Sequence, residues 1–117
     1  MDGLILLKSG LEGVNLIQYG LVKYIKLMAD YQCFPIWNML PGDYRDMDPC
    51  ELPISKELQV RILKWAAIYD ETLDADYPPN SGFKSEKLER EFRREGERLV
   101  MMLREELGAD FSVVLKV

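Results

Sequence analysis

The fold is decided by one stretch, residues 85–108, which reads SEKLEREFRREGERLVMMLREELG. Its apolar residues recur at three- and four-residue spacing and predict one amphipathic helix. Ser85 is the expected N-cap, Glu86 lies at the positive end of the helix dipole, and Gly108 is expected to end the helix. The predicted buried stripe consists of Leu88, Phe92, Gly96, Leu99, Leu103 and Leu107.

Gly96 costs the helix about 1 kcal/mol relative to Ala, yet it lies on the buried stripe. A glycine there permits close approach by a bulky neighbour, and we expect that neighbour to be Trp65 or Tyr69. Both belong to a second predicted helix at residues 56–73, which begins after the N-cap Ser55. Its apolar positions are Leu58, Ile62, Trp65, Ala66, Tyr69 and Leu73.

Segments rich in β-branched, aromatic and other apolar residues flank these helices and predict strands at residues 4–7, 14–19, 21–31 and 111–117. Both faces of the 21–31 strand carry apolar residues, as expected of a central strand. Residues 1–20 could instead form an accessory hairpin or extension. We therefore expect a single domain over residues 1–117, an α+β two-layer sandwich in which two antiparallel helices cover one face of an antiparallel or mixed sheet.

Residues 32–53 contain four prolines, which exclude a long regular element and predict an ordered loop or a run of turns. Phe34, Ile36, Trp37 and Leu40 are too apolar for a solvated linker, so we expect them to hold this loop on the core. Trp37 could alternatively be an exposed interface anchor, because Trp is enriched at binding hot spots.

Charge is distributed unevenly along the sequence. The net charge is −5, and residues 30–76 alone hold ten acidic and four basic residues, for a net of −6. A negative field repels phosphate backbones and attracts cationic surfaces, which disfavours direct nucleic-acid binding. No segment reaches the roughly 18 apolar residues that a membrane span requires, and no secretory signal is recognisable. We expect a cytoplasmic protein without a membrane partner.

Two acidic strings are the candidate binding residues: Asp70, Glu71, Asp74, Asp76 with Tyr77, and Asp43, Tyr44, Asp46 with Asp48. The first string is placed at the negative end of a helix dipole, where acids are mildly destabilising. It could be a solvated helix end, a surface for a cationic partner, or a site for Ca²⁺ or Mg²⁺. The second string fails as an EF-hand, because Glu51 stands where the loop requires Gly.

Catalytic motifs are missing from the sequence. There is no histidine, and we find no phosphate-binding glycine loop, nucleophile elbow or zinc-ligand spacing. Cys33 and Cys50 form no CxxC pair, and without a histidine nothing indicates that either thiol is activated. We expect a non-enzymatic protein with no cofactor, no catalytic residues and no metal ligands.

A set of short motifs is spread over the sequence from about residue 22 onward. They consist of Tyr31, Cys33, Pro35 and Trp37; residues 52–55; Trp65, Ala66, Tyr69, Asp70, Thr72 and Leu73; residues 76–79 and 81–83; and Phe92, Glu95 and Gly96. In these motifs the sequence resembles a group of small acidic bacterial proteins of polymorphic toxin systems, including contact-dependent growth inhibition (CDI).

This resemblance implies an immunity protein, an inhibitor that binds the toxin domain of its own system. Such toxins are often nucleases with basic clefts, for which an acidic surface is the complementary partner. The hypothesis from sequence is therefore neutralisation of a cognate toxin domain through the two acidic strings. A phage-type acidic inhibitor of a nucleic-acid enzyme and a small carboxylate-metal protein are the alternatives.

Overall fold

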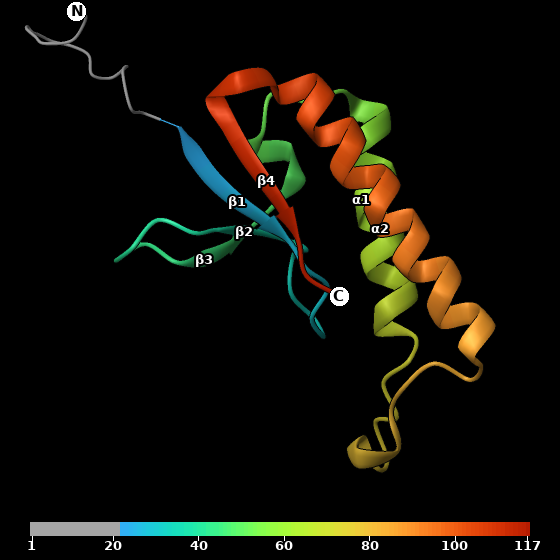
Figure 1. Cartoon of the computed structure of the whole chain (residues 1–117). Coiled ribbons are helices and arrows are strands. Elements are labelled where there is room, and N and C mark those ends of the chain that lie inside the picture. The colour runs from blue at the N-terminus through green and yellow to red at the C-terminus, as the bar shows by residue number, and fades with distance from the viewer. Residues whose placement is uncertain (1–21) are drawn as a thin grey trace, which may run out of the picture.

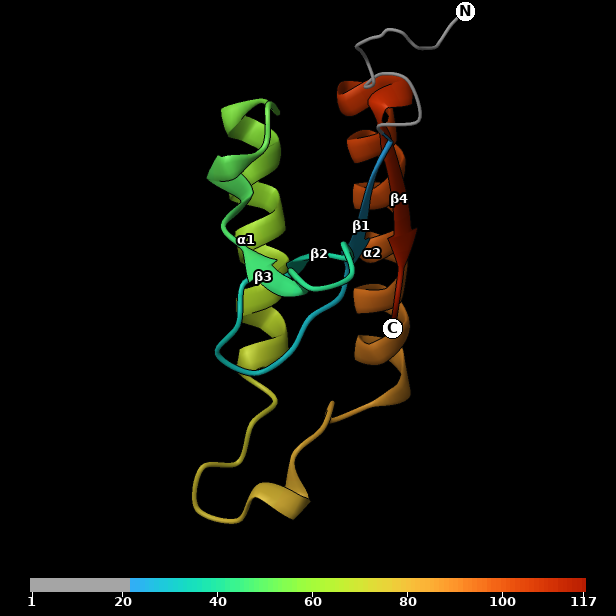
Figure 2. The same ribbon diagram turned by 90° about the vertical axis from the view of Figure 1, so that its left-hand side faces the viewer.

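The computed structural model describes residues 22–117 as two layers, a four-stranded sheet and two helices. The strands are β1 (Lys23–Leu27), β2 (Ile36–Asn38), β3 (Arg45–Met47) and β4 (Phe111–Leu115). The long helices are α1 (Lys56–Asp70) and α2 (Glu86–Leu107), which lie side by side on one face of the sheet (Figures 1 and 2). The predicted α+β class is confirmed. The predicted strands at 4–7 and 14–19, and the hairpin or extension at 1–20, lie outside the described residues.

The sheet is mixed, with the strand order β3-β2-β1-β4. β1 pairs antiparallel with β2 and parallel with β4, so its predicted central position is confirmed. Ile25 and Leu27 are buried towards the helices. β1 ends at Leu27, earlier than predicted, because the chain turns within residues 30–33, where the amide of Cys33 donates to the carbonyl of Asp30 and Gln32 adopts a φ of 60°.

Residues 32–53 contain no long regular element, as their prolines predict, but they include the antiparallel pair β2 and β3 and a short 3₁₀ helix, η2 (Pro49–Glu51), which the sequence did not indicate. Each strand is three residues long and fits between the prolines. Ile36 is completely buried and holds the segment on the core, whereas Phe34 and Leu40 are exposed, contrary to expectation. The indole N–H of half-buried Trp37 donates to the carbonyl of Met28 at 2.9 Å.

α1 begins as predicted, with the hydroxyl of Ser55 accepting from the amide of Leu58 at 3.1 Å. The same hydroxyl donates to the carboxylate of Glu106, which joins the start of α1 to the end of α2. α1 ends at Asp70, three residues before the predicted end. The Thr72 amide and hydroxyl both bond the carbonyl of Tyr69, and this local turn replaces the next helical hydrogen bonds.

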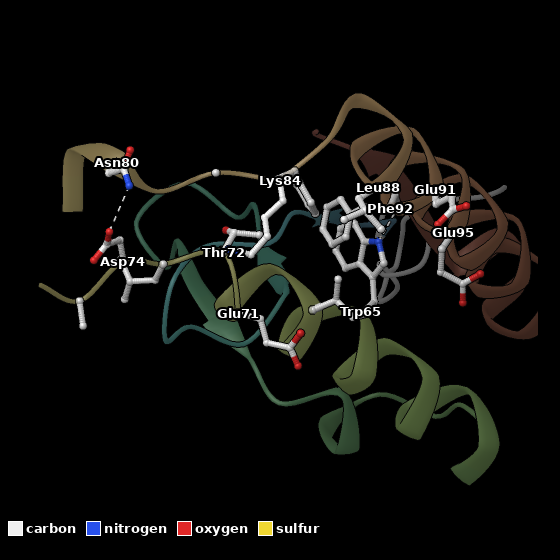
Figure 3. A pocket seen from close by; sticks show the side chains of 15 residues that line it. Trp65, Glu71, Thr72, Asp74, Asn80, Lys84, Leu88, Glu91, Phe92 and Glu95 are labelled. Carbon is white, nitrogen blue, oxygen red and sulfur yellow. Dashed lines mark hydrogen bonds between the residues drawn. The ribbon is translucent and has the colours of Figure 1, made fainter. Parts of the chain in front are cut away.

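α2 has the predicted ends, because the hydroxyl of Ser85 accepts from the amide of Leu88 and Gly108 has a φ of 73°. Leu88 is the exception to the predicted buried stripe, since 47% of its surface is exposed. It lies in the first turn of α2, next to the loop that joins the helices (Figure 3).

The two helices meet where Trp65 packs on Gly96. The Trp65 ring stacks on Phe92 at a centroid distance of 4.4 Å, and its N–H donates to the Phe92 carbonyl at 2.9 Å. A Cβ atom at Gly96 would lie 3.0 Å from the Trp65 ring and 3.2 Å from the side chain of Leu115. The predicted partner of Gly96 is therefore confirmed as Trp65. Around this contact lie the other core residues, Ile25, Leu27, Ile36, Leu52, Ile54, Leu58, Ile62, Leu99, Val100, Leu103, Leu107 and Val113.

Replacing Gly96 with Val should lower the free energy of unfolding by about 2 kcal/mol, since overpacking a dense core costs roughly 1–3 kcal/mol. Trp65 cannot yield easily, because its ring stacks on the Phe92 ring and its N–H donates to the Phe92 carbonyl. Urea unfolding followed by tryptophan fluorescence measures the effect. Glu97→Val is the control, because Glu97 is the exposed neighbour on the same helix. Equal midpoints for the two variants would contradict the packing account.

Candidate functional site

The structure brings one residue of each acidic string to the same turn, residues 30–34 between β1 and β2. The carboxylate of Asp70, at the end of α1, accepts from the amide of Gln32 at 3.0 Å. The carboxylate of Asp46, from β3, accepts from the amide of Phe34 at 2.8 Å. Asp30 adds a third carboxylate that the sequence analysis did not select. These acids hold the turn in place, which is a structural task as well as a source of negative charge.

Aromatic contacts fix the same turn to the end of α1. The ring of Tyr31 stacks on Tyr69 at a centroid distance of 4.6 Å. The Tyr31 hydroxyl shares a 2.7 Å hydrogen bond with the hydroxyl of Thr72. Tyr69 also packs against Phe83 and Phe92. Many residues that carry the family resemblance are therefore parts of one network that joins the turn, α1 and α2.

Cys33 lies in the midst of this negative charge. Burial raises the pKa of its thiol, and the negative charges of Asp30, Asp46 and Asp70 raise it further. A raised pKa disfavours the thiolate, the reactive form of cysteine. The environment of Cys33 thus opposes a nucleophilic role.

Asp74 organises the loop between the helices. Its carboxylate accepts from the amides of Asp76 and Tyr77 at 3.1 and 3.0 Å, and from the side-chain amide of Asn80 at 3.3 Å. The hydrogen bonds from Tyr77 and Asn80 are the main causes that lower the pKa of Asp74. Its own amide donates to the hydroxyl of Ser81. The hydrogen bonds of Asp74 therefore serve to hold the loop in its conformation.

The hairpin of β2 and β3 separates the members of the second string from one another. Asp43 accepts from the side chain of Asn38 at 3.0 Å, and Asp48 caps η2 by accepting from the amide of Cys50 at 2.9 Å. Tyr44 stacks on Trp37 at a centroid distance of 5.4 Å. The structure therefore unites Asp46 with Asp70, but it leaves Asp43, Tyr44 and Asp48 on a different part of the surface.

Asp70, Glu71, Asp76 and Tyr77 are the exposed members of the first string, and of these Asp70 is engaged with the amide of Gln32. Tyr77 keeps 64% of its surface accessible. Glu71 is the C-cap of α1, and Asp76 and Tyr77 follow in the interhelical loop. Their side chains are in a position to meet a partner without disturbing the core.

A cleft of about 790 Å³ opens between the end of α1, the interhelical loop and the start of α2 (Figure 3). The stacked rings of Trp65 and Phe92 form part of its floor, and Glu71 lines it at the C-terminal end of α1. This cleft could not be found from the sequence, because helical spacing placed Leu88 on the buried stripe and gave no reason to single out Ile68. Its other lining residues are Ile68, Thr72, Leu73, Asp74, Ala75, Asn80, Gly82, Phe83, Lys84, Leu88, Glu91 and Glu95.

Within residues 22–117, no group of three or more Cys, Asp or Glu side chains is placed to hold a metal ion. No helix in this range has the length and apolar character needed to cross a bilayer.

Asp74 gives a prediction about pH. Because its pKa is lowered in the folded loop, its hydrogen bonds stabilise the loop above the usual aspartate pKa of about 3.9, and this contribution is lost as the pH falls through the lowered value. The amide NMR shifts of Asp76 and Tyr77 should titrate with one midpoint below the usual value. Asp74→Asn should abolish the transition. A midpoint at or above the usual value would contradict the assignment.

Comparison with protein families finds a match over residues 23–116 to the family described as Serratia CdiI immunity protein-like. A search of curated proteins finds no match to this chain. The matched region runs from the first residue of β1 to the residue after β4, so it contains the four strands and the two long helices of residues 22–117. The resemblance drawn from the sequence motifs is thereby confirmed, and the chain belongs to the Serratia CdiI immunity protein-like family.

Proposed function

We propose that this protein neutralises the toxin domain of its own CDI system by binding it in the cytoplasm and obstructing its active site or substrate surface. The family match over the whole described sheet and both helices is the observation that carries this proposal. Binding requires no catalysis by this chain and no cofactor.

The acidic end of the molecule is the surface that we propose for the first encounter. We define it by Asp30, Asp70, Glu71, Asp76 and Tyr77, which are all exposed. They lie on the turn between β1 and β2, at the end of α1, and in the interhelical loop, which occupy the same end of the molecule in Figures 1 and 2. This end belongs to the segment whose net charge is −6.

Such a surface suits a toxin with a basic cleft, as in a nuclease. Enzymes that bind nucleic acid concentrate Lys and Arg where the phosphates lie. A negative surface is attracted to the same residues and accelerates association, most strongly at low salt. The acidic end could thus occupy the place of the phosphate backbone. Tyr77 offers an aromatic contact among the charges, of the kind that contributes strongly to protein interfaces.

The direct test uses the toxin domain encoded beside this protein. Cells that produce the toxin domain should survive when they also produce this chain, and the two proteins should co-purify as a heterodimer. A toxin domain from an unrelated CDI system serves as the specificity control. Loss of both protection and co-purification would refute the proposed function.

Charge reversal tests the surface. Glu71→Lys combined with Asp76→Lys should slow association with the toxin domain about tenfold at low salt and weaken the salt dependence, because electrostatic steering changes on-rates by factors of 10 to 1,000. We choose these two residues because no described backbone hydrogen bond is accepted by their side chains, unlike those of Asp70 and Asp74. Surface plasmon resonance at two salt concentrations gives the rates.

The control for this double variant is Glu97→Lys combined with Glu105→Lys, which makes the same change in net charge on exposed positions of α2. Equal association rates for the two double variants would place the encounter surface elsewhere. Thermal unfolding checks that both remain folded.

A further inference from the structure

The cleft between the helices exposes apolar surface that the fold does not use. Ile68 on α1 and Leu88 on α2 both line it, and each keeps 47% of its surface accessible. Beneath them lie the aromatic rings of Trp65, Phe83 and Phe92. Concave apolar surface with a few polar groups around it is typical of a binding site.

Carboxylates dominate the charged residues around this apolar surface. Four acids, Glu71, Asp74, Glu91 and Glu95, line the cleft together with one basic residue, Lys84. Figure 3 shows Glu91 and Glu95 on α2 and Glu71 on the facing end of α1. The cleft therefore combines an apolar floor with a net negative rim.

Two of these four acids are already engaged within the protein. Glu95 pairs with Arg61 at 2.8 Å and with Arg98 at 3.0 Å. Asp74 accepts the loop hydrogen bonds described above. Within residues 22–117, no ion pair or hydrogen bond involves the carboxylate of Glu71 or Glu91, which come from opposite sides of the cleft.

We propose that this cleft is the anchor site for the toxin domain and receives a segment that carries an apolar side chain next to a Lys or Arg. This inference rests on the proposed function and names the chemistry of the contact. The aliphatic stem of Lys or Arg covers apolar surface while its charged head reaches a carboxylate. The apolar floor and the rim carboxylates Glu71 and Glu91 match these two parts.

The anchor site and the acidic end have different kinetic roles. Exposed charges mainly govern the association rate and its salt dependence. Buried apolar contacts surrounded by a water-excluding rim carry most of the affinity, and their loss appears in the dissociation rate. Glu71 belongs to both surfaces, so the toxin steered by the acidic end arrives beside the cleft.

The apolar floor is tested with Ile68→Ser and Leu88→Ser, measured against the wild-type cognate toxin domain. Each variant should bind about tenfold more weakly, through faster dissociation, because removal of a hot-spot side chain costs more than 1 kcal/mol. Val60→Ser is the matched control, since Val60 is an exposed β-branched residue on α1 that does not line the cleft. It should leave the affinity unchanged.

The rim is tested with Glu91→Lys, and Glu97→Lys is the control with the same change of charge on the same helix. Glu97 is exposed and does not line the cleft. Glu91→Lys should weaken binding at least fivefold more than Glu97→Lys, and the difference should persist at high salt because the contact is local. All variants are checked by thermal unfolding, and the exposure of the substituted residues makes large losses of stability unexpected.

The outcomes separate the anchor site from the proposed function. If the wild-type protein does not bind the toxin domain, the proposed function fails and the anchor site fails with it. If the wild-type protein binds and the cleft variants behave like Val60→Ser and Glu97→Lys, the anchor site is overturned while the function stands. The anchor site is also overturned if the wild-type protein self-associates and Leu88→Ser abolishes that association, because the cleft would then hold a second copy of the chain.

Discussion

The packing of Trp65 on Gly96 is the contact on which the rest of the structure depends. It allows the backbone of α2 to approach α1 closely, because a Cβ atom at position 96 would lie only 3.0 Å from the indole ring. The same ring stacks on Phe92 and donates to its carbonyl, so the relative position of the helices is defined by apolar packing and by a directional bond. The bidentate pair of Arg61 with Glu95 and the bond from Ser55 to Glu106 join the helices at two further points. Leu115 of β4 also approaches Gly96, which brings the sheet to the same place.

The position of the candidate surfaces follows from this packing. With the helices fixed, the end of α1 presents Tyr69, Asp70 and Thr72 to the turn between β1 and β2, where they bind Tyr31 and Gln32. Gln32 holds a positive φ there, a conformation that a residue with a side chain rarely adopts and that surrounding contacts must support. Motif residues that carry the family resemblance thus build the platform. The residues proposed to recognise the toxin, such as Glu71, Leu88 and Glu91, lie beside this platform and are free of its constraints.

Negative charge has two uses in this protein. Asp46, Asp48, Asp70 and Asp74 accept backbone hydrogen bonds in turns and caps, where a carboxylate satisfies amides that no regular element pairs. Their charge still contributes to the field outside the molecule, because they lie near the surface. One set of residues therefore supports the loops and, in the proposed function, attracts a cationic partner. Substitutions that remove such residues change both the support of the loops and the attraction of the partner. Substitutions of exposed acids without backbone contacts therefore test the recognition of the partner more directly.

The sequence by itself determined the local elements of this protein. Helical spacing and the caps Ser55, Ser85 and Gly108 were sufficient for both helices, since these features act over a few residues along the chain. The glycine on the buried stripe marked the α2 side of their contact, and the structure decided between Trp65 and Tyr69 as its partner. Local pattern also identified the central strand β1 and the closing strand β4. It did not identify β2 and β3, because a three-residue strand between prolines carries no periodic pattern of its own and exists only through pairing, of β2 with β1 and of β3 with β2. Tertiary structure alone decided that Asp46 meets Asp70 at one turn, that Asp43 and Asp48 lie elsewhere, and that Leu88 borders a cleft. Each of these depends on which distant segment lies opposite a given side chain, and the packing of the helices on the sheet sets that arrangement.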